Sequence, residues 1–137
     1  MVKEIIRDVD FLSKPLAKAT KDDLHIIDDL IDTAEEHRDN CLGLTANQIG
    51  YDKRIIVVKI DEKYIPFVNP VITQKSKETY IAAEGCLSLD GIRTVKRCRN
   101  IRLTWLDAKF KSHSNIFGGL TAEIIQHEVD HCNGKLI

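Results

Sequence analysis

The chain has 137 residues, of which 43% are hydrophobic and 30% are charged, and its formal net charge is −1. This composition fits one globular domain over residues 1–137 with its own core, and it excludes a disordered chain. Charges of both signs are interspersed without a basic stripe, and no apolar stretch is long enough for a signal peptide or a membrane span. We therefore expect a cytoplasmic protein without nucleic-acid or membrane partners.

The first part of the chain predicts one helix. Pro15 limits helix formation in residues 1–20, which we expect to be irregular. Thr20 is a candidate N-cap, and apolar residues recur at helical spacing over residues 24–34. This pattern predicts a helix that ends at about residues 36–38.

The middle of the chain predicts strands, because short β-branched or alternating segments are separated there by turn residues. A loop or extended segment at residues 41–50 precedes them. The predicted strands are residues 55–58, 64–72 with an interruption at Asn69-Pro70, 78–83, 94–95 and 101–105, and residues 109–113 pair with the last of these through a turn at Asp107-Ala108.

A second helix is expected near the C-terminus. Gly118-Gly119 precedes it, Thr121 is a candidate cap, and Gly134 is typical of a helix stop. The order of one helix, several strands and a second helix predicts an α+β domain. We expect mainly antiparallel sheets packed around the C-terminal helix, with both helices covering sheet faces.

The most informative segment is His-Glu-Val-Asp-His at residues 127–131. His127 and His131 lie four residues apart, so on a helix their rings share one face and can bind one metal ion. Glu128 beside them can move protons for a metal-bound water. The alternative is a helix whose histidines have this spacing without a function.

A catalytic metal centre needs a third protein ligand and one open position. Cys86 is the best candidate, because a thiolate binds zinc or ferrous iron strongly and Gly85 lets the backbone turn close to an ion. The alternative is a buried structural cysteine, which describes Cys98 and Cys132 better. No two cysteines form a CxxC pair, so a structural zinc knuckle is not expected.

Gln48 lies in a loop of small residues at positions 43–50. A side-chain amide near a metal can donate a hydrogen bond to a developing oxyanion. Taken alone, a surface glutamine is the default interpretation.

Three segments, in order and spacing, resemble the peptide deformylase family, which removes the formyl group from the N-terminal methionine of new bacterial proteins. Residues 41–48, Cys-Leu-Gly-Leu-Thr-Ala-Asn-Gln, resemble the family's glycine–apolar–glycine–apolar–Ala–Ala–x–Gln motif. Residues 84–88 and 126–131 match its Glu-Gly-Cys-Leu-Ser and Gln-His-Glu-x-Asp-His motifs without change. The resemblance covers essentially the whole chain and indicates a compact, somewhat divergent member.

The resemblance implies a metal-dependent hydrolase that acts on N-formylmethionyl peptides. The ligands of its one divalent ion would be Cys86, His127 and His131. In this family the ion is Fe²⁺, and Zn²⁺, Ni²⁺ or Co²⁺ can replace it. Glu128 would take a proton from water and later give it to the leaving amine. Gln48 and the backbone N–H of Leu87 would hold the carbonyl oxygen.

The resemblance also implies supporting residues around the substrate and the ligands. They are Gly43, Glu84, Ser88, Arg93, Arg97 and Asp130. Asp130 would be an orienting residue with Arg97 as its partner, and a solvated helix carboxylate is the alternative. Arg93 would lie near the substrate backbone.

Four residues depart from the family pattern. They are Cys41, Thr45, Asn47 and Glu123, and the first three replace glycine, alanine and proline. Cys41 is expected to narrow or re-aim the pocket wall, and Asn47 to leave Gln48 less firmly positioned. Glu123, one turn before His127, would repel anionic or favour basic substrate residues, and a solvated carboxylate near the helix start is the alternative.

Other functions remain open at this point. One is a deformylase-like amidase for another N-acylated peptide, and another is a non-catalytic metal-binding homologue. A zinc endoprotease also uses His-Glu-x-x-His, but its third ligand usually comes from beyond the helix, where only six residues follow His131. We further expect a monomer that works close to the ribosome.

Overall fold

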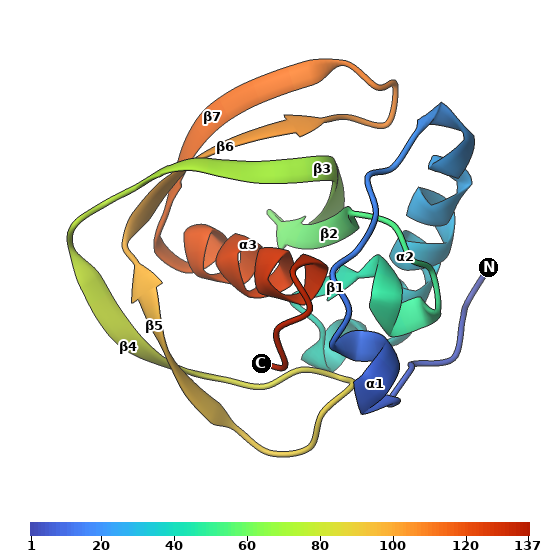
Figure 1. Ribbon diagram of the computed structural model, residues 1–137, viewed down its shortest axis with the longest axis horizontal. Helices are drawn as coiled ribbons and strands as arrows, with labels where there is room; N and C mark the ends of the chain where they lie inside the picture. The colour runs from blue at the N-terminus through green and yellow to red at the C-terminus, as the bar shows by residue number, and fades with distance from the viewer.

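Strands occupy the middle of the chain and helices its two ends in the computed structural model, which describes residues 1–137 (Figure 1). The elements are α1 (Val9–Leu12), α2 (His25–Glu36), β1 (Gly43–Thr45), β2 (Ile55–Ile60), β3 (Lys63–Lys75), β4 (Thr79–Glu84), β5 (Arg93–Cys98), β6 (Asn100–Leu106), β7 (Ser112–Gly118) and α3 (Gly119–Cys132). Short 3-10 helices lie at Lys21–Asp23, Arg38–Asn40 and Ala46–Ile49. None of the helices combines the length and the apolar character that a membrane crossing requires.

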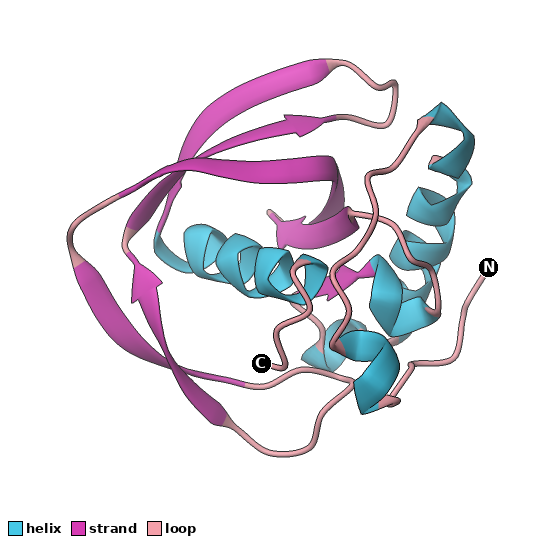
Figure 2. Cartoon of the chain, viewed as in Figure 1, coloured by secondary structure: helices cyan, strands magenta, loops and turns pink.

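Five strands form one antiparallel sheet in the order β1-β2-β3-β6-β7, and β4 pairs with β5 in a separate antiparallel sheet. Figure 2 shows α3 between the large sheet and the β4–β5 ribbon. The predicted α+β class with mainly antiparallel sheets is confirmed. This arrangement brings the end of β4 against the face of α3 that carries the histidines.

β2 contributes to the core on both of its faces, because α2 covers one face and α3 the other. Ile55 and Val57 belong to the apolar cluster around Leu30 of α2. Ile56 and Val58 belong to the cluster around Ile125 of α3. A strand buried on both faces reads as a continuous β-branched run rather than as an alternating one. The expectation that both helices cover sheet faces is confirmed.

The predicted interruption at Asn69-Pro70 is a bulge inside one long strand, β3. The pairing of β3 with β6 shifts register between Val68 and Val71, and Asn69 has a φ of 49°. Asparagine tolerates this left-handed conformation, and its side chain bonds both the N–H and the carbonyl of Ala19, at 2.8 and 3.0 Å.

Two N-terminal details differ from the predictions. The lead-in contains α1, whose N-cap Asp8 accepts a hydrogen bond from the Asp10 N–H at 3.0 Å. Thr20 precedes the 3-10 turn instead of α2, since its N–H donates to the Asp23 carboxylate at 2.8 Å. α2 itself begins at His25.

Two details near the C-terminus also differ. The last strand is β7, residues 112–118 rather than 109–113, because Asp107 extends the turn by accepting the N–H groups of Lys109 and Lys111. The N-cap of α3 is Gly118 rather than Thr121. The predicted stop is confirmed: α3 ends at Cys132, and Gly134 follows with a φ of +78°.

Gly134→Ala should lower the free energy of unfolding by about 2–4 kcal/mol, measured by urea denaturation. A Cβ at Gly134 would lie 2.5 Å from the Ser13 carbonyl oxygen, in addition to the positive φ. Gly91→Ala is the matched control, since Gly91 has a φ of +82° but no atom within 4 Å of an added Cβ. The control should lose only about 1 kcal/mol. Equal losses would contradict the steric explanation.

Candidate metal centre

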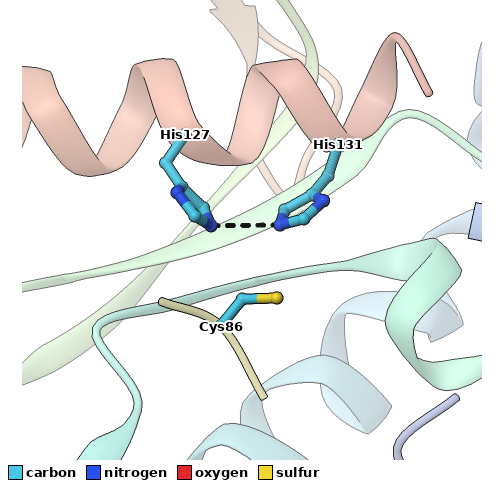
Figure 3. Close-up of side chains that lie close together, drawn as sticks. All are labelled: Cys86, His127 and His131. Atoms are coloured by element: carbon cyan, nitrogen blue, oxygen red, sulfur yellow. Dashed lines mark hydrogen bonds between the residues drawn. The ribbon is translucent and has the colours of Figure 1, made fainter. Parts of the chain in front are cut away.

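Cys86, His127 and His131 converge beside α3. The sulfur of Cys86 and one ring nitrogen of each histidine lie within 4.8 Å of one another. The two Nε2 atoms are 3.0 Å apart, and Figure 3 shows both rings pointing from α3 toward the space that the sulfur of Cys86 also faces. The structure therefore brings together the three residues that the sequence singles out as metal ligands.

Local structure explains how the sulfur reaches the histidines. Helical spacing places His127 and His131 on one face of α3, and Cys86 lies two residues beyond the end of β4. A Cβ at Gly85 would lie 3.1 Å from Ile92 Cδ1, so a larger residue there would displace the exposed Ile92 side chain. The site thus needs the β4–β5 ribbon packed against α3.

A buried network of charges holds His127. Its Nδ1 lies 2.8 Å from Glu84 Oε1, and Arg97 donates to both oxygens of Glu84 from Nε and Nη2, at 2.9 and 2.6 Å. Arg97 Nη1 also donates to Asp130 Oδ2 at 2.5 Å. Asp130 is therefore paired with Arg97, not merely solvated. A carboxylate on the second ring nitrogen sets the orientation of a ligating histidine.

The charges in this network shift three pKa values. Burial opposes ionisation of Glu84, but hydrogen bonds from Arg97 and His127 outweigh it and lower its pKa to about 2. Burial also disfavours charged His127, yet hydrogen bonds with Cys86 and Glu84 raise its pKa to about 10. Burial and the charge of His127 lower the pKa of His131 to about 3. The two shifts run in opposite directions, as expected for two close imidazoles of which only one carries a positive charge.

Glu128 is buried beside the histidines. Its Oε1 accepts a hydrogen bond from the Thr45 hydroxyl at 2.8 Å, and burial raises its pKa above the ordinary 4.5. Gly43 lies against the same carboxylate, since a Cβ there would be 2.9 Å from Glu128 Oε2. The segment 41–50, which includes the short strand β1, therefore leaves room for this carboxylate and bonds it.

Gln48 is buried in the 3-10 helix Ala46–Ile49. Its Oε1 accepts from the Thr45 N–H at 3.0 Å, and its Nε2 donates to the Ser88 hydroxyl at 3.2 Å. Asn47 beside it donates to the His131 carbonyl at 3.3 Å. The expectation that Asn47 loosens Gln48 is wrong, because both ends of the amide are bonded.

A pocket of about 180 Å³ opens beside the three converging residues. Its walls are Asn40, Cys41, Leu42, Gly43, Ala83, Glu84, Gly85, Cys86, Leu87, Leu120, Glu123, Ile124, His127 and Glu128. Leu87 is among these residues, whereas Gln48 is not. Arg93 is also absent from the walls, and its Nη1 donates to the Asp90 carbonyl at 3.4 Å. The structure does not bring Arg93 to the pocket.

Tyr80 contacts the pocket residue Glu123, although no sequence motif pointed to it. Its hydroxyl donates to Glu123 Oε1 at 2.8 Å, so Glu123 is bonded and lines the pocket rather than being merely solvated. The signal was present in β4, where Tyr80, Ala82 and Glu84 alternate with exposed residues. In a strand, alternate side chains share one face.

Comparison with known proteins agrees with this geometry. The family model described as polypeptide deformylase matches residues 4–137. A peptide deformylase of Clostridium beijerinckii is 46% identical over 137 residues, which cover 100% of both chains. The chain belongs to the peptide deformylase family. Enzymes of this family remove the formyl group from formyl-methionyl peptides.

Solved peptide deformylases share the fold of this family member. The class I type b peptide deformylase of Acinetobacter baumannii has a TM-score of 0.90 and 33% identity, over 99% of this chain and 97% of that one. A peptide deformylase of Legionella pneumophila has a TM-score of 0.90 and 34% identity, over 99% and 83%. The resemblance inferred from three short motifs therefore extends to the whole deformylase fold.

In the metal-depleted deformylase, Glu84→Gln should make the free energy of unfolding depend less on pH in the acid range. The pKa of Glu84 is lowered in the folded protein, so its stabilisation is present above about pH 4.5 and is lost as the pH falls toward about 2. The loss amounts to up to about 3 kcal/mol. Urea unfolding from pH 6 to pH 3 measures it, with Glu36→Gln at an exposed position as the control. Parallel pH profiles of the wild type and Glu84→Gln would contradict this role.

Proposed function

We propose that residues 1–137 form one catalytic domain, a metal-dependent hydrolase that removes the formyl group from formyl-methionyl peptides. The observation that carries this proposal is the convergence of Cys86, His127 and His131 beside the buried carboxylate of Glu128. These three residues would hold one divalent ion, which would acidify a water molecule and polarise the formyl carbonyl.

The donor set fits such an ion. Two nitrogens bound to one ion at about 2.1 Å each lie at most about 4.2 Å apart, and the two Nε2 atoms are 3.0 Å apart. One thiolate and two imidazoles suit Fe²⁺, Zn²⁺, Ni²⁺ or Co²⁺. We propose Fe²⁺ as the native ion, as the family resemblance implies.

Glu128 moves the proton. It removes a proton from the water that attacks the formyl carbon, and delivers it to the amide nitrogen as the C–N bond breaks. Formate and a free amine leave. Burial raises the pKa of Glu128, which improves its match to both tasks. The Thr45 hydroxyl holds one of its oxygens, and Gly43 leaves space for the other.

Gln48 and Leu87 stabilise the negative charge that develops on the formyl oxygen. The donors are the side-chain amide of Gln48 and the backbone N–H of Leu87. Two observations support this assignment. Gln48 lies against Ser88, two residues from Cys86, and Leu87 lines the pocket. Arg97 and Asp130 act indirectly, since they hold the Glu84 that orients His127.

The pocket receives the first side chain of the substrate. In one crystal structure the Acinetobacter baumannii enzyme binds Met-Ala-Ser. This peptide is what remains when formyl-Met-Ala-Ser is deformylated. In this chain Leu42, Leu120 and Ile124 supply apolar walls for a methionine side chain. We further propose that the enzyme acts as a monomer in the cytoplasm, close to the ribosome that releases its substrates.

Glu128→Gln should lower kcat for formate release from formyl-Met-Ala-Ser by about 10²–10⁴. Its metal content should equal that of the wild type, because no ligand changes. Cys86→Ala should lose the metal as well as the activity. Glu36→Gln is the matched control and should leave both unchanged, since Glu36 is an exposed carboxylate of α2. A folded, metal-loaded wild type that releases no formate would reject the proposal.

The iron-loaded enzyme should lose activity in air, while the nickel-loaded enzyme should retain it. Oxygen oxidises ferrous iron and the sulfur of Cys86, which is a ligand in this proposal. Formate release is followed during aeration, and a chelator should abolish the activity of both forms until Ni²⁺ is restored. Iron-dependent activity that survives prolonged aeration would count against Fe²⁺ as the native ion.

A further inference from the structure

Three carboxylates line the pocket, and their partners differ. Glu84 is neutralised by Arg97, and Glu128 lies at the reaction centre with the Thr45 hydroxyl. The partner of Glu123 is uncharged, and no lysine or arginine lines the pocket. The pocket wall therefore carries a negative charge that no cation of the chain pairs with.

The phenol of Tyr80 orients the Glu123 carboxylate. Its phenol donates to Glu123 Oε1 at 2.8 Å, across the gap between β4 and α3, while no group of the protein bonds Oε2. Burial and the hydrogen bond to Glu123 raise the pKa of Tyr80 to about 12, so the phenol stays a donor. Arg99 lies 5.1 Å from the centre of the Tyr80 ring but pairs with Glu78, not with Glu123. One oxygen of Glu123 is thus available to a ligand.

The distance along α3 suits a long substrate side chain. Glu123 precedes His127 by one helical turn, a rise of about 6 Å along the axis. Ile124 and Leu42 line the same pocket as Glu123 and give it apolar walls. An extended lysine has a comparable reach, with an apolar stem and a charged end.

We propose that Glu123, positioned by Tyr80, lets this enzyme deformylate N-formyl peptides whose first side chain is long, linear and cationic, above all lysine, in addition to methionine. This inference rests on the proposed function and names a further substrate class for the same site. The apolar walls contact the stem, and the free oxygen of Glu123 pairs with the ammonium group. The reaction is unchanged: water adds to the formyl carbon, the C–N bond breaks, and formate leaves.

Two substrates with the same stem test the inference. We expect metal-loaded wild type to hydrolyse both formyl-Lys-Ala-Ser and formyl-norleucyl-Ala-Ser, and the readout is the ratio of their kcat/KM values. Glu123→Gln keeps the shape of the side chain and removes its charge. It should lower the lysine-to-norleucine ratio about tenfold. Glu36→Gln, with the same change of net charge on the exposed side of α2, should leave the ratio unchanged.

Salt provides a measurement that needs no variant. Raising NaCl to about 0.5 M should lower the wild-type ratio toward that of Glu123→Gln, because screening weakens the attraction. Hydrolysis of formyl-Met-Ala-Ser without hydrolysis of the lysine peptide would overturn the inference and leave the proposed function intact. A ratio insensitive to both Glu123→Gln and salt would do the same. An absence of formate from all three peptides would overturn both.

Discussion

The guanidinium group of Arg97 links three elements, β4, β5 and α3. It lies on β5 with only 4% of its side chain exposed, and it pairs with Glu84 at the end of β4 and with Asp130 on α3. A buried charge is costly unless every partner is in place. The ribbon is therefore held where Cys86, just beyond Glu84, faces the histidines. The same Glu84 bonds His127, so one buried ion pair supports both the position of the sulfur and the orientation of a ring.

Three glutamate side chains line the pocket, and each lies in different surroundings. Glu84 lies between Arg97 and His127, and its pKa falls to about 2. Glu128 is buried with only a hydroxyl partner, and its pKa rises. Glu123 bonds a phenol farther along the pocket. Partners and burial thus give different chemical surroundings to three glutamates of one pocket, Glu84 at the end of β4 and Glu123 and Glu128 on α3.

Three of the residues that depart from the family pattern pack around the site and make hydrogen bonds there. Thr45 bonds Glu128, and Asn47 bonds the His131 carbonyl. Cys41 is buried in the pocket wall, where its Sγ donates to the Gly43 carbonyl at 3.3 Å. Each of these three residues therefore bonds α3 or the segment 41–50 beside the pocket. None of them replaces Cys86, His127 or His131, the three residues that could hold a metal ion.

Local patterns in the sequence determined the α+β class, the order of the main elements and the residues that converge at the centre. Helical and strand periodicities extend over a few residues and can be read along the chain. Tertiary structure alone decided that Gln48 bonds Ser88, that Arg93 stays away from the pocket, and that Tyr80 meets Glu123 43 residues later. These outcomes depend on how the β4–β5 ribbon packs on α3, which no local periodicity encodes.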